Sequence, residues 1–106
     1  MTVLIFYLEI MQEKVEDIVI ETLVELNEEL ESVLLENPTK NTKLFGGSGA
    51  LDSLNLVSLI TDLEGRISDE FDADIVLADE KAMSQRTSPF RSVETLSNYI
   101  VQLLSE

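Results

Sequence analysis

Residues 44–64 read LFGGSGALDSLNLVSLITDLE and join a glycine-rich loop to the start of an amphipathic helix. Asp52 or Ser53 is expected to open that helix, because both side chains accept hydrogen bonds from the free amides of a first helical turn. Apolar residues follow at three- and four-residue steps, with Asp62 and Glu64 outside the stripe. The expected apolar stripe consists of Leu54, Val57, Ile60, Leu63, Ile67 and Phe71.

The chain before this stretch predicts a long first helix from Gln12 to Glu36. Pro38 is expected to stop it, because proline cannot continue the hydrogen-bond ladder and disfavours helical geometry in Asn37. The apolar stripe of this helix is expected to contain Val15, Ile18, Val19, Leu23, Leu26, Leu30, Val33 and Leu34. Residues 39–51 then form a loop, which three apolar side chains are expected to pin to the core: Leu44, Phe45 and Leu51.

The chain after this stretch predicts two more helices. A short third helix is expected at residues 79–83, followed by a connection at residues 84–91. Ser92 is a good N-cap for a last helix, whose apolar face contains Val93, Leu96, Ile100, Leu103 and Leu104. No stretch alternates with the period of two that indicates a strand. The sequence therefore predicts an all-α domain over residues 1–106, a small four-helix bundle with a long first loop and a short third helix.

Composition limits the functions that this domain can have. The 106 residues include 44% hydrophobic residues, which indicates a globular chain, and carry a formal net charge of −14. This charge argues against nucleic acid or an anionic membrane and favours partners with basic surfaces. Cysteine and histidine are both absent, which removes the usual zinc ligands and every Ser-His or Cys-His pair. We expect neither a metal site nor catalysis by the chain itself.

The first ten residues are apolar but do not fit a targeting or spanning segment. They have no basic flank and no small-residue cleavage site, and they are too short to cross a bilayer. We interpret residues 1–11 as an extension of the first helix or as a non-core N-terminal extension, and Met11 is as good a start site as Met1. The protein is expected to be cytoplasmic and monomeric.

Ser53 is the strongest candidate for a functional residue. A serine in the first turn of a helix is exposed and lies near unpaired backbone amides and the positive end of the helix dipole. A phosphodiester at that point is electrostatically favourable. The alternative interpretation is an ordinary capping pair, in which Asp52 or Ser53 satisfies the first amides of the helix.

The wider pattern favours the phosphodiester. Residues 44–64 resemble the signature of acyl carrier proteins, and Ser92-Val93-Glu94-Thr95-Leu96 with Asn98-Tyr99-Ile100 resembles the last helix of that family. The resemblance covers Val15 to Leu104. It implies a bundle of acyl-carrier type, in which Ser53, flanked by Asp52 and Leu54, carries covalent phosphopantetheine derived from coenzyme A.

The same resemblance implies the partners. A phosphopantetheinyl transferase modifies Ser53, an acyl- or aminoacyl-loading ligase charges the arm, and synthases or acyltransferases of fatty-acid, polyketide or related biosynthesis receive the cargo. Such enzymes have basic docking patches, which Val57, Asp62 and Glu64 are expected to contact.

Two departures from the family leave the choice of partner open. Ser58 stands where many fatty-acid carriers have glutamate, and Leu56 stands where a small polar residue is frequent. The form Leu51-Asp52-Ser53 is similar to D-alanyl and aminoacyl carriers, so the cargo need not be a fatty acid. An alternative function from another class is an acidic helical adaptor, which binds a basic or amphipathic partner through its long first helix.

Overall fold

The structure is a computed structural model that describes residues 2–47, 49–77 and 88–105. Within these ranges it contains three α-helices and one 3-10 helix: α1 (Thr2–Leu30), η1 (Val33–Leu35), α2 (Ser53–Phe71) and α4 (Val93–Leu104). The same ranges hold isolated β-bridges but no regular strand. The all-α class is therefore confirmed for the described chain. The expected short helix at residues 79–83, and with it the fourth helix of the bundle, lies outside the described residues.

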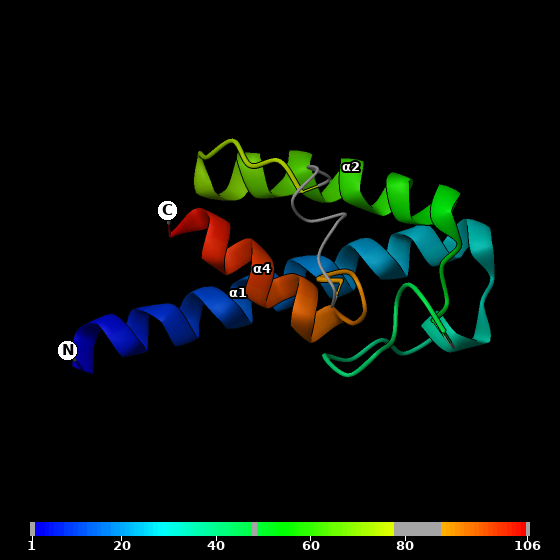
Figure 1. The fold of residues 1–106 in the computed structure, drawn as a ribbon, viewed down its shortest axis with the longest axis horizontal. Coiled ribbons are helices and arrows are strands. Elements are labelled where there is room, and N and C mark those ends of the chain that lie inside the picture. Colours follow the sequence, from blue (N-terminus) through cyan, green and yellow to red (C-terminus); the bar gives the residue numbers. More distant parts are fainter. Residues whose placement is uncertain (1, 48, 78–87, 106) are drawn as a thin grey trace.

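Helix α1 packs against both of the other α-helices. Both α2 and α4 contact α1 and run in the opposite direction to it (Figure 1). Val15, Val19 and Leu23 of α1 are fully buried. Their four-residue spacing places them on one face of the helix, so a single stripe serves both neighbours.

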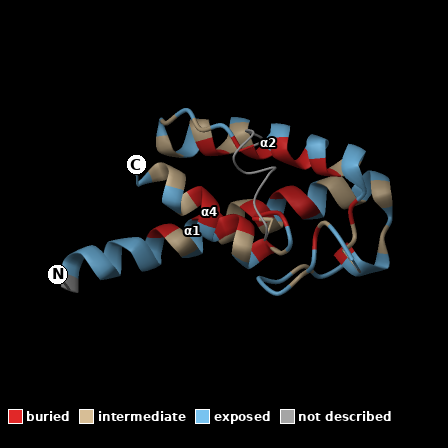
Figure 2. Cartoon of the chain, viewed as in Figure 1, coloured by how far each residue is buried: buried red, intermediate tan, exposed pale blue. Residues whose placement is uncertain are grey.

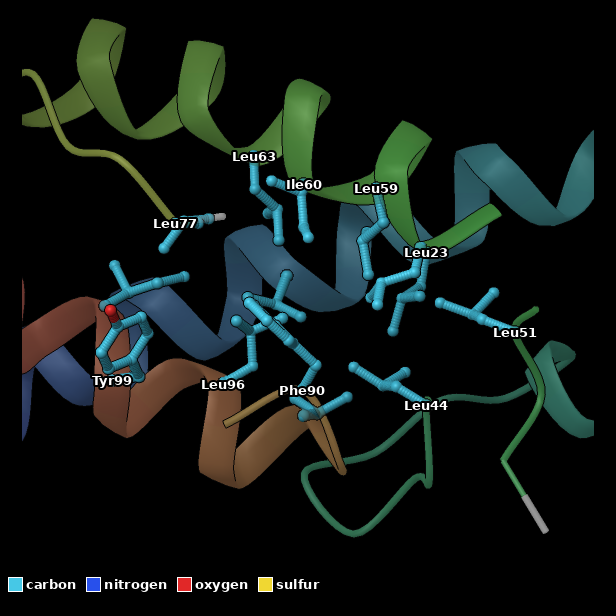
Figure 3. Close-up of a cluster of buried hydrophobic side chains, with 14 of the residues drawn as sticks. Leu23, Leu44, Leu51, Leu59, Ile60, Leu63, Leu77, Phe90, Leu96 and Tyr99 are labelled. Atoms are coloured by element: carbon cyan, nitrogen blue, oxygen red, sulfur yellow. The ribbon is translucent and has the colours of Figure 1, made fainter. Parts of the chain in front are cut away.

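The core lies between the three helices and also receives side chains from the connecting segments. Figure 3 shows side chains of α2 directed towards Leu23 of α1 and towards Leu96 and Tyr99 of α4. Four further buried residues come from outside the helices: Leu44, Leu51, Leu77 and Phe90. Each such side chain contributes about 1.5–3 kcal/mol through burial, so the loops are fixed by the same apolar cluster as the helices.

Helix α1 includes the extension of the first helix that the sequence allowed before Gln12, but its C-terminal bound differs from the predicted Glu36. The helix begins at Thr2 and ends at Leu30, well before Pro38. Asn27 explains the early end, because its side chain accepts a hydrogen bond from the amide of Ser32 at 2.7 Å and donates to the Ser32 carbonyl at 3.2 Å. Glu31 between them has the left-handed φ of 51°, which does not continue a helix.

The early end of α1 also changes which residues reach the core. Val33 and Leu34, expected in the buried stripe, are 77% and 61% exposed, whereas Leu35 is fully buried. A 3-10 helix begins here with Ser32 as its N-cap. Its three-residue turn differs from the 3.6 residues of an α-helix, so the predicted stripe is wrong at these positions.

The N-terminal part of α1 extends beyond the body of the molecule. Residues 3–10 are exposed, and Met11 is the first buried residue of the helix. Figure 2 shows this segment as a pale blue end of the helix, separate from the buried faces. None of the described helices combines the length and apolar character needed to cross a membrane.

Helix α2 buries a face rotated from the predicted one in its first half. Leu54 and Val57 are 76% and 59% exposed, so their assignment to the apolar stripe is wrong. The buried residues are Leu56, Leu59, Ile60, Leu63 and Ile67. These positions also follow three- and four-residue steps, and packing on α1 selects them over the alternative stripe.

The last helix agrees with the sequence. Ser92 is its N-cap, and the Ser92 hydroxyl accepts a hydrogen bond from the amide of Thr95 in a reciprocal capping arrangement. Val93, Leu96 and Ile100 are buried as expected. Leu103 and Leu104 are partly buried against the same core, so the predicted apolar face is confirmed.

The loop before α2 is pinned as predicted. Leu44 is fully buried, Leu51 is 5% exposed and Phe45 packs partly buried against the core. The amide of Leu51 donates to the carbonyl of Leu44 at 2.8 Å, which closes the glycine-rich turn. Gly49 passes so close that a Cβ atom there would lie 2.5 Å from the backbone oxygen of Leu44.

Two glycine substitutions test this packing in opposite directions. Gly49→Ala should lower the free energy of unfolding by about 1–3 kcal/mol, because the new methyl group meets immobile backbone. Gly65→Ala should raise it by about 0.5–1 kcal/mol, since Gly65 lies inside α2 with nothing within 4 Å of an added Cβ. Urea denaturation followed by circular dichroism measures both. Equal effects of the two substitutions would contradict the described loop.

Candidate functional site

Ser53 is the first residue of α2 and is exposed. The chain reaches it from Leu51, which is buried in the core, and passes through Asp52. The buried anchor lies only two residues before the serine. The burial of Leu51 therefore fixes the position of Ser53 at the surface, in the first turn of the helix.

Asp52 caps the helix and leaves the serine hydroxyl free. The Asp52 side chain accepts a hydrogen bond from the amide of Asn55 at 2.8 Å. The backbone carbonyl of Asp52 accepts one from the amide of Leu56 at 2.9 Å. Ser53 has helical geometry inside the helix, so it is not the cap. Of the two capping candidates in the sequence, Asp52 takes this role alone.

The electrostatics of the helix start suit an anion attached to Ser53. The amides of Ser53 and Leu54 precede the first intrahelical bonds and have no acceptor within the helix. The helix dipole adds the equivalent of about half a positive charge at this end, which the Asp52 carboxylate partly offsets. An exposed hydroxyl beside two unpaired amides fits a phosphodiester, and Ser53 would hold the group.

Exposed apolar side chains flank the serine. Leu54 follows it directly, and Val57 lies one helical turn further along α2. Both are largely exposed, so they provide an uncharged surface next to the hydroxyl. A flexible arm or a partner protein that reaches Ser53 would pass over this surface.

Acidic side chains from two helices gather around a groove beside that surface. The groove has a volume of about 440 Å³ and contains Val57 and Asp62 of α2 together with Glu25 and Glu29 of α1. The structure therefore brings two predicted partner-contact residues together. The sequence did not indicate that Glu25 and Glu29 line this groove, because their position there depends on how α1 packs against α2.

Glu64, the third predicted partner-contact residue, does not line this groove. It is only partly exposed, and its carboxylate accepts a hydrogen bond from the amide of Leu77 at 2.8 Å. That bond holds the segment after α2 in place, with Leu77 fully buried. Contact of Glu64 with a partner stays a prediction.

Comparisons with known proteins add no relative to this picture: no protein-family model matches the chain, and neither the curated proteins nor the solved structures give a match. A function for this chain is therefore inferred from the motif around Ser53 and from the geometry of the site.

Substitution of Asp52 tests its role as the cap. Asp52→Ala should lower the free energy of unfolding by about 1 kcal/mol, because the amide of Asn55 loses its acceptor. Asp52→Asn retains a side-chain oxygen and should leave stability within about 0.5 kcal/mol of the wild type. Ser53→Ala should do the same. Thermal or urea denaturation measures all three, and a large loss with Ser53→Ala would show that the serine takes part in capping.

Proposed function

We propose that this chain is an acyl carrier protein that holds acyl or aminoacyl groups as thioesters on a phosphopantetheine arm attached to Ser53. The observation that carries the proposal is the exposed position of Ser53 in the first turn of α2, with capping performed by Asp52. The hydroxyl is thus available for modification without loss of the helix start. The resemblance of residues 44–64 to the acyl-carrier signature supports the same assignment.

The proposal assigns the chemistry to other proteins. A phosphopantetheinyl transferase supplies the base and the metal, and the Ser53 oxygen forms the new bond to phosphorus as the nucleotide part of coenzyme A leaves. The reactive thiol then belongs to the arm. This division fits a chain without histidine or cysteine. Its own residues anchor the arm and present the cargo.

The acidic groove supports the proposed partners. Asp62 and Glu29 line it together with Glu25, which already pairs with Arg66, and the whole chain has a formal net charge of −14. Opposite charge accelerates encounter and selects partners, so loading ligases, synthases and acyltransferases with basic patches are the partners that we propose. Leu54 and Val57 supply apolar contact beside the arm. The setting proposed is cytoplasmic fatty-acid, polyketide or related biosynthesis.

Modification by a phosphopantetheinyl transferase tests the proposal. Incubation with coenzyme A and a transferase of broad specificity should raise the intact mass by one phosphopantetheine group. Ser53→Ala should abolish this gain, since the attachment oxygen is lost. Ser58→Ala should not, because Ser58 is exposed on the same helix but lies outside the Asp52-Ser53-Leu54 attachment tripeptide.

The comparison of the two serine variants decides the outcome. A mass gain that survives Ser53→Ala, or a folded wild-type chain that remains unmodified, would contradict the carrier. Denaturation curves of both variants should match the wild type, so that the loss of modification reports the missing hydroxyl rather than unfolding.

One observation favours a second candidate, an acidic adaptor that binds a basic or amphipathic partner through α1. The N-terminal part of this helix exposes large apolar side chains on a solvent-facing extension, and exposed apolar surface of this kind is typical of interaction sites. The most exposed are Val3 at 82% and Phe6 at 63%. The next part of α1 is rich in glutamate, which would suit cationic residues of the same partner.

Substitutions in α1 separate the adaptor from the carrier. In the adaptor, Phe6→Ser should weaken binding of a basic amphipathic peptide by about tenfold or more, since burying a large apolar side chain contributes about 1.5–3 kcal/mol. Val24→Ser, at an exposed position of the same helix, is the matched control. Fluorescence anisotropy of the labelled peptide measures both. Binding that is equally sensitive to both changes, or to neither, contradicts the adaptor.

A further inference from the structure

The positive charges of the described chain fall into two groups. Lys14 pairs with Glu70 at 2.9 Å, and Arg66 pairs with Glu25. The remaining cations of residues 2–47, 49–77 and 88–105 have no ion pair, although acidic residues outnumber basic ones threefold in the sequence, at 21 to 7. These unpaired cations are Lys40, Lys43 and Arg91.

Backbone hydrogen bonds bring the unpaired cations together. The loop before α2 lies beside the start of α4 (Figure 1), and Lys43 forms an antiparallel bridge with Ser92. The Arg91 carbonyl accepts from the amide of Leu44 at 2.7 Å, and the Lys40 carbonyl accepts from the amide of Glu94 at 2.8 Å. Two segments far apart in sequence are thus fixed in register, which brings the backbone positions of these cations near one another.

A cavity of about 610 Å³ lies in this region, and Lys43 and Arg91 both line it. Neutral donors line it as well. The Asn41 side-chain amide has no partner in the described chain, and the Ser88 hydroxyl accepts from the amide of Phe90 at 3.1 Å, so its own hydrogen is free to donate. Phe45 adds an aromatic wall. The volume lies in the range of small-molecule sites.

We propose that this cavity binds a small phosphate-bearing molecule. Lys43 and Arg91 line one cavity and neither forms an ion pair in the described chain, so an anion bound there would give both cations a partner. Arg91 offers planar paired donors and Lys43 a point charge, and both are common ligands of phosphate. Asn41 and Ser88 complete the set of donors.

The strongly negative chain does not prevent such binding. At physiological salt, charges further than about 8 Å are largely screened, so the local cations dominate the interaction. A partly open hollow of this volume fits a small molecule, whereas a stable contact with another protein would need a more extended surface. The inference does not rest on the proposed carrier function, because Ser53 does not line this cavity.

Titration with phosphate probes tests the site. Inorganic phosphate and adenosine 3′,5′-bisphosphate are added separately at constant ionic strength, and amide resonances are followed by NMR. Saturable shifts are expected at Gly46 and Gly47, which line the cavity. Saturation by both probes supports the site and assigns recognition to the phosphate group. Saturation by the bisphosphate alone also supports the site, and shows that the ligand must fill more of the cavity than phosphate does.

Charge-matched variants control for net charge. The double variant Lys43→Gln, Arg91→Gln should bind about tenfold or more weakly, because it loses two charge-assisted contacts. The double variant Lys14→Gln, Arg66→Gln carries the same change in charge and should retain the affinity, as should Ser53→Ala. Absence of saturable shifts, or equal weakening by both double variants, would overturn the proposal. Denaturation curves establish that the variants are folded.

Discussion

The buried stripe of α1 is the constraint on which the rest of the structure depends. Val15, Val19 and Leu23 are fully buried on the helix that both α2 and α4 contact, so the three helices meet in one core. The loop residues Leu44 and Leu51 join the same apolar cluster. The position of Ser53 is therefore set by the two residues before it. Leu51 is buried in the core, and Asp52 caps the helix that Ser53 begins. A site held by packing and capping in this way needs little flexibility of its own and leaves motion to whatever is attached to it.

Local signals in the sequence predicted the parts of the structure that local chemistry decides. The sequence predicts Ser92 as an N-cap, because a serine directly before a helical apolar pattern can accept a hydrogen bond from the first free amides. The structure confirms this cap. The pinned loop was predicted from Leu44 and Leu51, which a solvated linker would not need. The exposed serine at a helix start follows from the same reasoning, since an Asp-Ser pair ahead of an apolar stripe marks the start of a helix, where Asp52 provides the cap.

Tertiary packing decided the parts that the sequence did not reveal. The end of α1 is an exception, because it is decided locally by the Asn27 side chain, which hydrogen-bonds to the backbone of Ser32 and which the apolar spacing does not reveal. Two apolar stripes were compatible with the spacing in α2, and contact with α1 selected the one that leaves Leu54 and Val57 exposed. Glu25 and Asp62 share a groove although they are far apart in sequence. No local pattern encodes such meetings, because each requires two elements to be in place.

The length of α1 separates two ends of the molecule. The molecule extends 42 Å along its longest axis, and in Figure 1 the free start of α1 and the start of α2 lie near opposite ends of that axis. A protein engaged with one end leaves the other open to solvent. A protein bound at the apolar tip would therefore not cover Ser53.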